Sequence, residues 1–403
     1  MSTETGAEDG ASLEARLRSA RRWHIEYGGY LSNHLTHNWV VLALGGAGAP
    51  VLDRWARAYA DPGKALPLEP AWLLDRSGAE PAIDPAALVR LRGCGMAQFP
   101  ALQAAFDRAV ASRGRTAVAA ASLPSLLPGL AGAAFHPLIH VGLGIEAGSD
   151  SMVADGLAYW TCIYQPLGSA HDAPLWRPEP SAAAGTLMAA IAGQLERARA
   201  ARLDQSIAAA VREPRYRRRH RGEFQHRMMV FADPALAPAA WLDGLGPLAL
   251  APVGSLATEI EQLRGWIAEL LLASRNEFFV LHGLTSCYAL GTLLSLLDPG
   301  AQRDALAAWV RAALAAVVAQ RFPGLDADVK QPSMLIGAER WADLRRLSWR
   351  SSDEHVPKAV YALWRWYERA TDSAHRARYA AAAAALVQRA DGGDPADNLW
   401  FAA

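Results

Sequence analysis

Apolar residues recur at helical spacing along most of this chain. Near the N-terminus, Leu35, Trp39 and Leu42 lie three or four residues apart, which predicts a helix over 13–47. Strand-like alternation is scarce, and Ala, Leu and Arg, which favour helix, dominate the composition. Similar spacing predicts further helices at 51–59, 85–113 with a break at Gly93–Gly95, 152–164, 183–212, 255–297, 301–320, 338–348 and 358–391. The most apolar stretch, Ile267 to Leu297, is interpreted as a buried core helix or a helix pair.

The fold class that these patterns predict is mainly α. We expect a single large helical domain over 13–403, with Pro/Gly-rich loops at 62–84, 165–182 and 233–254. Residues 1–12 are acidic and polar, and we expect them to be disordered. Because the segments with candidate chemistry occur both early and late in the chain, a division into two independent domains is not expected.

Composition narrows the class of protein. About half of the 403 residues are apolar (52%), enough for a sizeable core, and the formal net charge of +0 gives no reason to expect nucleic acid or a membrane as partner. Cys94, Cys162 and Cys287 lie far apart without a CxxC motif, so we expect no disulfide framework and a cytoplasmic location. No signal-peptide pattern or uninterrupted apolar run of about 18 residues occurs. The sequence leaves open whether the protein forms a homo-oligomer.

Six of the eleven histidines fall in four short segments, and two of these segments carry histidine pairs. His34 and His37 are three residues apart, which places them about 60° apart around a helix axis. His136 and His140 are four residues apart, and Pro137 indicates a helix start beside His136. Each pair can therefore present both imidazoles to one side.

The other two segments carry one histidine each. His282 lies in the very apolar stretch 278–285, and His355 precedes a helix start at Pro357, with Lys358 in the first turn. Neutral imidazole is a good ligand for iron, zinc or copper, and histidines one turn apart can converge on one ion. A lone histidine such as His282 is more often an ordinary core residue, so the metal-site hypothesis depends on the four segments together.

At these four segments the chain resembles the questin oxidase-like family. The resemblance spans about residues 20 to 370 and rests on GYLSNHLTH (29–37), FHPLIHVGLGIE (135–146), LHGLT (281–285) and DEHVPK (353–358). It implies a non-haem iron oxygenase that opens or oxygenates quinone rings of aromatic polyketides, with a Baeyer–Villiger-like outcome. It also implies histidine ligands, a carboxylated lysine and, in some descriptions of the family, NADPH.

Carried over motif by motif, the resemblance implies roles for seven side chains. A buried lysine beside a cation has a lowered pKa, and its neutral amine can add carbon dioxide and become an anionic oxygen ligand. The predicted metal ligands are His37, His140, His282, His355 and the carboxylated Lys358. The residues predicted to face the substrate or to support these ligands are His34, His136 and, again, Lys358.

Several neighbouring side chains are weaker candidates. Trp39, Tyr27 and Phe135 flank the histidines and are candidates for stacking on a flat substrate, although core packing explains them equally well. Glu146 and Asp150 are candidates for orienting an imidazole by accepting its second N–H, although each could instead cap a helix.

Other patterns carry less weight. Gly142–Gly148 is glycine-rich but has the wrong spacing for a dinucleotide loop and no preceding strand, so no Rossmann-type NADPH site is expected. The basic run Arg215–Arg221 is interpreted as a solvated loop, with RNA binding or a cover over the active site as alternatives. The remaining histidines have polar or arginine-rich neighbours and are expected at the surface or in loops: His24, His171, His220, His226 and His375.

Three functions therefore compete. The first is an iron-dependent oxygenase that uses O2 on a small aromatic or quinone-like substrate. The second is a zinc-type hydrolase with a carbamylated lysine, and the third is a non-catalytic protein that binds flat aromatic molecules. The family resemblance favours the first.

Overall fold

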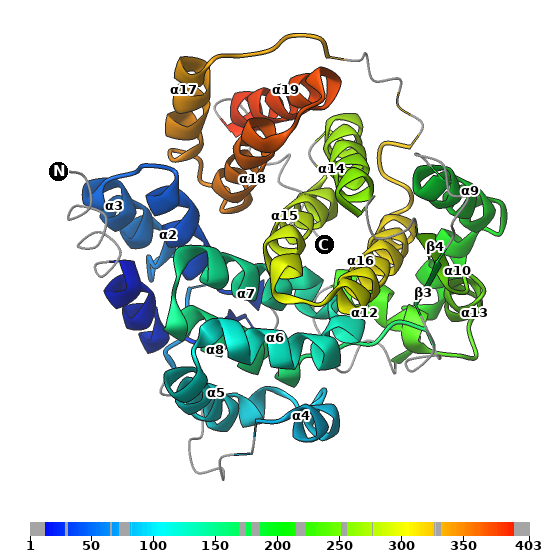
Figure 1. Cartoon of the computed structure of the whole chain (residues 1–403), viewed down its shortest axis with the longest axis horizontal. Helices are drawn as coiled ribbons and strands as arrows, with labels where there is room; N and C mark the ends of the chain where they lie inside the picture. The colour runs from blue at the N-terminus through cyan, green and yellow to red at the C-terminus, as the bar shows by residue number, and fades with distance from the viewer. Residues whose placement is uncertain are drawn as a thin grey trace.

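The described part of the protein is mainly helical, which confirms the predicted fold class, and it contains two small two-stranded sheets (Figure 1). The structure is a computed structural model that describes residues 13–28, 31–64, 67–71, 81, 83–168, 175–178, 186–214, 223–250, 256–275, 277–325, 327 and 332–390. The prediction for residues 1–12 and the basic run Arg215–Arg221 lie outside these ranges.

The helices run through the whole described part of the chain. In the first half they are residues 13–19, α2 (Leu35–Leu44), α3 (Ala49–Tyr59), α4 (Pro85–Leu91), α5 (Phe99–Arg113), α6 (Arg115–Leu126), α7 (His136–Ala147) and α8 (Asp150–Cys162). In the second half they are α9 (Thr186–Ala200), α10 (Leu203–Ala210), α12 (Glu223–Met229), α13 (Ala237–Asp243), α14 (Leu256–Ala273), α15 (Phe278–Leu293), α16 (Pro299–Ala319), α17 (Ala338–Ser348), α18 (His355–Arg369) and α19 (Ser373–Ala390).

The two sheets are minor elements. β1 (Glu26–Tyr27) and β2 (Leu31–Ser32) pair antiparallel, whereas β3 (Trp176–Pro178) and β4 (Leu248–Leu250) pair parallel. The glycine-rich segment 142–148 lies in α7 and at its C-terminal cap, not in a loop between a strand and a helix. The described residues therefore contain no sheet of the size that a Rossmann-type NADPH site requires.

Helix breaks account for the differences from the predicted elements. Gly93 and Gly95 adopt φ values of +70° and +86°, which separates α4 from α5 as predicted. The continuous helix predicted over 13–47 is wrong, because the chain forms the β1–β2 hairpin with Gly28 at φ +60°. The helix predicted over 183–212 is likewise divided at Arg202, which has φ +52°.

Two further predicted segments are divided into shorter elements in the structure. The stretch predicted as 358–391 is the helix pair α18 and α19, and the loop predicted over 233–254 includes α13 and β4. Hydrophobic periodicity continues across such breaks, because it records which face of a segment is buried and not where the hydrogen-bond ladder stops.

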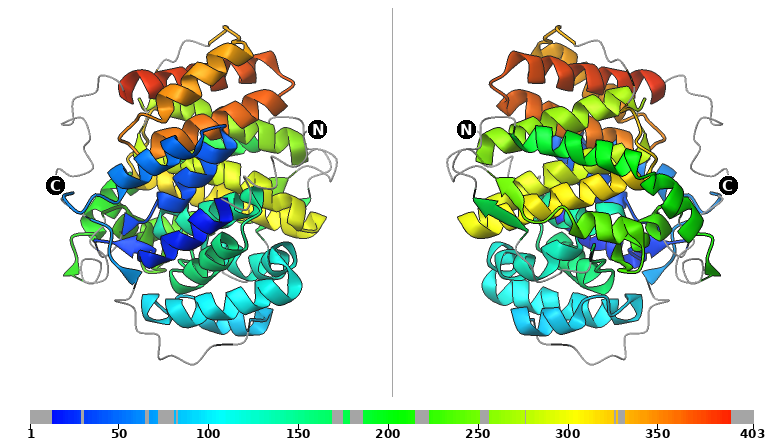
Figure 2. Two further views of the ribbon diagram at one scale, coloured as in Figure 1. Left: turned by 90° about the vertical axis from the view of Figure 1, so that its left-hand side faces the viewer. Right: turned by 90° about the vertical axis from the view of Figure 1, so that its right-hand side faces the viewer.

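Four helices that are distant in sequence form a closed ring in the middle of the molecule. α2 contacts α7 and α18, and α15 contacts the same two helices from the other side. Outside the ring, α8 covers α7, α14 and α16 cover α15, and α19 covers α18. Side views show the C-terminal helices at one end of the molecule and α4 to α6 at the other (Figure 2).

Close backbone packing holds the ring together where α7 crosses α15. A Cβ atom added at Gly142 would lie 2.6 Å from the Ala289 Cβ and 2.8 Å from its Cα, so only glycine allows this approach. The stretch Phe278–Leu296 is long and apolar enough to cross a membrane, but 72% of it is buried inside the protein. This burial is that of a core helix, as predicted.

Candidate metal centre

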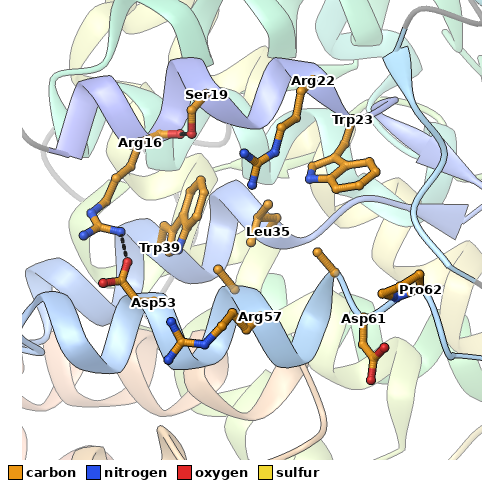
Figure 3. Close-up of a pocket in the computed structure, with 12 residues that line it drawn as sticks. Arg16, Ser19, Arg22, Trp23, Leu35, Trp39, Asp53, Arg57, Asp61 and Pro62 are labelled. Carbon is orange, nitrogen blue, oxygen red and sulfur yellow. Dashed lines mark hydrogen bonds and ion pairs between the residues drawn. The ribbon is translucent and has the colours of Figure 1, made fainter.

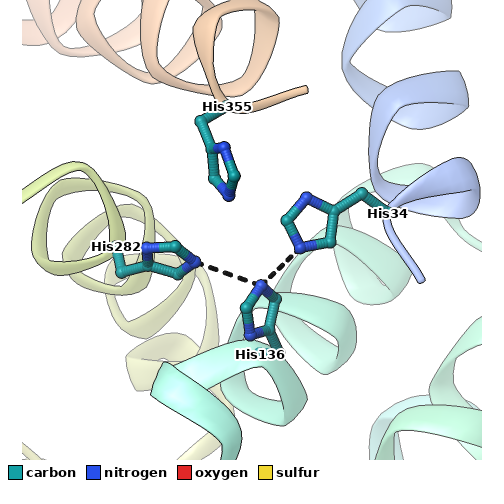
Figure 4. A group of neighbouring side chains, drawn as sticks. All are labelled: His34, His136, His282 and His355. Carbon is teal, nitrogen blue, oxygen red and sulfur yellow. Dashed lines mark hydrogen bonds between the residues drawn. The ribbon is translucent and has the colours of Figure 1, made fainter. Parts of the chain in front are cut away.

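Four histidines from the four ring helices meet at one point. His34 caps α2, His136 begins α7, His282 lies in the second turn of α15, and His355 begins α18. One nitrogen from each ring lies within 4.8 Å of the other three, and all four side chains are buried. The imidazoles point toward a common centre (Figure 4).

Three of these rings are oriented by oxygen acceptors on their outer nitrogens. The His282 Nδ1–H donates to a carbonyl oxygen one turn earlier in α15 at 2.9 Å, and the His136 Nδ1–H donates to the Ala133 carbonyl. The His355 Nδ1–H donates to Asp353 Oδ1 at 2.7 Å. Because a neutral imidazole carries one N–H, each of these rings keeps a lone pair on Nε2.

The inner nitrogens of His136 and His282 face each other with no proton between them, because each ring holds its proton on Nδ1. His136 Nε2 lies 3.1 Å from His282 Nε2 and 2.5 Å from His34 Nε2. His355 Nε2 is buried and has no hydrogen-bond partner among the described residues. Opposed lone pairs repel unless a cation lies between them, and two nitrogens bound to one ion at about 2.1 Å are themselves about 3 Å apart. The donor set therefore fits a first-row transition metal.

Lys358 reaches the same group from the first turn of α18. Its Nζ lies 3.0 Å from His34 Nδ1, and the side chain is only 2% exposed. Burial lowers the pKa of Lys358 to about 7, although the charges of Glu354 and Asp353 act in the opposite direction. A substantial fraction of the amine is therefore neutral near pH 7, which is the form that can react with carbon dioxide.

Burial also keeps the imidazoles neutral. The pKa values of His34, His136 and His282 are lowered well below the ordinary value, first by desolvation and then by neighbouring positive charge, including that of Lys358. Only the neutral form of an imidazole binds a metal ion, so these rings can act as ligands at physiological pH.

His37 and His140 form a second pair beside the four-histidine group. His37 Nε2 lies 3.0 Å from His140 Nδ1, and the His37 ring stacks on His136 with 6.1 Å between ring centroids. The family resemblance implies His37 and His140 as ligands, and His34 and His136 as residues that support the ligands or face the substrate. The structure instead groups His34 and His136 with His282, while the ligand assignment itself stays a prediction.

A strained turn places His136 at the start of α7. Ala133, Ala134 and Phe135 have φ values of 44°, 53° and 67°, which are left-handed conformations for non-glycine residues. Such conformations cost about 1–2 kcal/mol per residue. The Gln225 carboxamide oxygen, turned toward this segment, accepts the N–H groups of Ala133 and Ala134 at 3.1 and 2.7 Å. α12 therefore helps to hold the segment that aims His136.

Hydrogen bonds fix His34 between three parts of the chain. Asn33 Oδ1 accepts the first helical N–H of α2 at 3.0 Å, and the His34 N–H donates to the Tyr59 hydroxyl at 2.8 Å. Asn38 Nδ2 donates to the Glu354 carbonyl at 3.0 Å, which ties α2 to the start of α18. The polar residues near the N-terminus of α2 thus have two roles, because they cap the helix and also position His34.

The acidic residues expected to orient an imidazole lie elsewhere. Glu146 accepts hydrogen bonds from the Tyr288 and Tyr361 hydroxyls at 2.5 and 2.9 Å, and Asp150 pairs with Arg115 at 2.9 Å. The expectation for both is therefore wrong among the described contacts. Asp353 has this role, and its position two residues before His355 at a helix start could have indicated it.

Aromatic rings do touch the histidines, but they are not the ones expected from sequence. The Phe278 ring lies 4.1 Å from His282 and 4.5 Å from His355 between centroids, and Phe279 lies 5.9 Å from His282. Phe278 precedes His282 by one helical turn, a spacing that could have signalled the contact. Phe135 is fully buried in the core, and Tyr27 is hydrogen-bonded to Tyr59.

Trp39 faces a separate pocket of about 500 Å³ on another side of α2 (Figure 3). The pocket lies between the N-terminal helical segment and α3, and an ion pair between Arg16 and Asp53 spans it. None of the six histidines lines it. The expectation that Trp39 stacks on a substrate beside the histidines is therefore not supported.

The remaining histidines divide into three cases. His24 and His375 are half-buried near the surface, consistent with the expectation from sequence. His226 is buried in α12, so the expectation of a surface position is wrong for this residue. His171 and His220 lie outside the described residues.

The fold and the site define a class of protein in which a ring of helices encloses a buried histidine centre suited to a transition metal. The sequence profile of the questin oxidase-like family matches residues 31–363, so the chain belongs to this family. The matched range includes all six histidines and Lys358. This confirms the predicted family and, with it, the prediction that the chain belongs to a family of oxidoreductases.

A characterised relative supports the same assignment. The chain is 32% identical over 172 residues to questin oxidase of Aspergillus fumigatus, which covers 38% of this chain and 36% of that protein. The aligned part thus spans about a third of the relative's length. The name of the relative states that it is an oxidase acting on questin.

Proposed function

We propose that this protein is a non-haem iron oxygenase that uses O2 to oxygenate or open the ring of an aromatic polyketide or quinone-like substrate. The observation that carries the proposal is the convergence of four buried imidazoles, each of which offers one nitrogen within 4.8 Å of the other three. Membership of a family named for an oxidase favours a redox-active metal over zinc, which has no redox chemistry.

We assign His34, His136, His282 and His355 as the ligands, with carboxylated Lys358 as the anionic one. This assignment replaces His37 and His140, which hydrogen-bond to each other through one nitrogen each and do not belong to the four-nitrogen group. Bound iron would supply the binding and activation of O2. The neutral Lys358 amine would form a bond from Nζ to the carbon of carbon dioxide and release a proton, which leaves a carbamate in place of a repelling ammonium.

The helix ends around the site favour this modification. α2, α7 and α18 all begin at the histidine group, so the positive ends of three helix dipoles lie near it. A helix N-terminus stabilises an anion and disfavours a cation. The arrangement therefore supports a carbamate at Lys358 and opposes protonation of the imidazoles.

The aromatic residues beside the histidines support a flat substrate. Phe278 and Phe279 are half-buried, and Phe279 stacks on Phe224 with 3.6 Å between ring centroids. Aromatic side chains bind planar rings by stacking and keep water from the reacting carbon. A quinone-like ring lying against Phe278 would be adjacent to His282 and His355.

Metal content and oxygen uptake test the proposal together. We expect the purified protein to contain iron and to consume O2 with questin or another aromatic quinone, and we expect His282→Ala to lose both properties. His375→Ala, which alters a half-buried histidine away from the centre, is the matched control and should retain both. Zinc with turnover that does not require oxygen would contradict the proposal and favour a hydrolase.

Lys358 can be tested separately. We expect Lys358→Ala to lower iron affinity at least about 10-fold, because an anionic ligand is removed, and we expect short carboxylates such as propionate to restore part of it. Lys64→Ala, at an exposed lysine, should leave iron affinity unchanged. If Lys358→Ala retains full iron affinity, the lysine is not a ligand.

A further inference from the structure

Cys94 and Cys162 are distant in sequence but adjacent in the fold. Cys94 lies in the turn after α4, and Cys162 is the last residue of α8. On either side of Cys94, the Gly93 N–H donates to the Thr161 carbonyl at 2.8 Å and the Gly95 N–H donates to the Cys162 carbonyl at 3.0 Å. These two bonds hold the turn against the end of α8.

The two thiols are within bonding reach of each other. Because both bonds join the residues beside Cys94 to the last turn of α8, the side chains of Cys94 and Cys162 leave neighbouring stretches of backbone. The side chains of Cys94 and Cys162 are hydrogen-bonded to each other. Cys162 is buried, whereas Cys94 is half-buried and open to a small reagent.

The two thiols also differ in pKa. The hydrogen bond from Cys162 lowers the pKa of the Cys94 thiol, and the same contact raises the pKa of Cys162. The thiolate therefore forms on the more accessible sulfur, and the buried sulfur stays protonated beside it. Reactive cysteines with a neighbouring resolving thiol have this arrangement.

We propose that Cys94 and Cys162 form a redox-active thiol pair that reduces a hydroperoxide and closes a disulfide. The Cys94 thiolate attacks one peroxide oxygen, the O–O bond breaks, and water leaves after protonation, which gives a sulfenic acid on Cys94. The Cys162 sulfur then attacks the Cys94 sulfur, the S–O bond breaks, and a second water carries away the Cys162 proton. Two thiols lose two electrons, and one hydrogen peroxide becomes two waters.

The inference does not depend on the metal centre, and Cys287 provides an internal control. Cys287 is buried in α15, and burial raises its pKa to about 12. We therefore expect hydrogen peroxide to protect Cys94 and Cys162 from alkylation without oxidising Cys287. Non-reducing digestion and mass spectrometry should find one peptide pair joined through Cys94 and Cys162, with the loss of two hydrogen atoms.

Variants separate the two steps of the reaction. Cys162→Ser, which keeps a hydrogen-bond donor beside Cys94, should leave Cys94 as a sulfenic acid that dimedone traps, whereas Cys287→Ala should form the disulfide as the unchanged protein does. Circular dichroism before and after oxidation checks that the bridge forms in the folded protein. The proposal fails if peroxide leaves Cys94 alkylation within about 2-fold of its initial rate, or if the bridge forms only after unfolding.

Discussion

The proton positions on single imidazoles decide whether the centre can bind a metal. Carbonyl oxygens and Asp353 hold the Nδ1 protons of three rings, so the Nε2 lone pairs face inward. The sequence identified all four histidines of this group as candidates, because imidazoles gathered in short motifs are a pattern typical of metal sites. It did not identify the acceptors, because a carbonyl oxygen carries no sequence signature.

The contact between Asp353 and His355 can be tested by substitution. We expect Asp353→Asn to lower metal affinity about 10-fold, because the charged acceptor of the His355 N–H is lost while asparagine can still cap α18. Metal titration of the chelated protein measures the effect. Asp343→Asn, in an exposed ion pair on α17, is the control and should leave affinity unchanged. Equal affinities in both variants would show that Asp353 does not orient His355.

Contacts between helices bring the separate histidine motifs together into one site. The positions of α2, α7, α15 and α18 in a ring bring together residues from the N-terminal tenth of the chain and from its last fifty residues. Helical periodicity predicted most of these elements, and the glycine break between α4 and α5 was readable from sequence. The β1–β2 hairpin was not, because short strands leave little periodic signal.

The close packing of α7 against α15 can be tested by substitution at Gly142. We expect Gly142→Ala to lower the free energy of unfolding by about 1–3 kcal/mol, because the added methyl group would overlap the backbone of Ala289. Urea unfolding measures this, and bound metal should fall because His136 and His282 lie on these helices. Gly193→Ala, in α9, meets only the end of an arginine and should stabilise the protein by about 0.5–1 kcal/mol. If Gly142→Ala leaves the free energy of unfolding unchanged, α7 and α15 can move apart enough to accept the methyl group, and the prediction is wrong.

The whole molecule must keep several basic side chains uncharged in its interior. Five of the fully enclosed histidines have pKa values lowered chiefly by burial: His34, His37, His136, His140 and His282. The pKa of His140 falls to about 3. The chain must therefore be stable enough overall to oppose protonation of its own centre.

This burial makes the stability of the metal-free protein depend on pH. Below the unfolded value of about 6.5 the unfolded chain binds protons that the folded chain excludes, so the free energy of unfolding falls as pH falls. Each histidine contributes up to about 1.4 kcal/mol per pH unit. We expect urea unfolding after chelation to show a steep decrease from pH 7 to 5, and a smaller one in the double variant His37→Asn, His140→Asn. A flat profile would contradict the burial of neutral rings.

The sequence by itself determined the helical class, most helix positions, the six candidate histidines and the family, because these depend on residue type and on spacing within one segment. Only the tertiary structure decided which histidines share a centre, because that depends on how α2, α7, α15 and α18 cross. The same holds for the grouping of His34 and His136 with His282 and His355, and for the meeting of Cys94 with Cys162. Local spacing fixes the face of a helix on which a side chain lies, whereas contacts between helices fix which atoms face one another across the core.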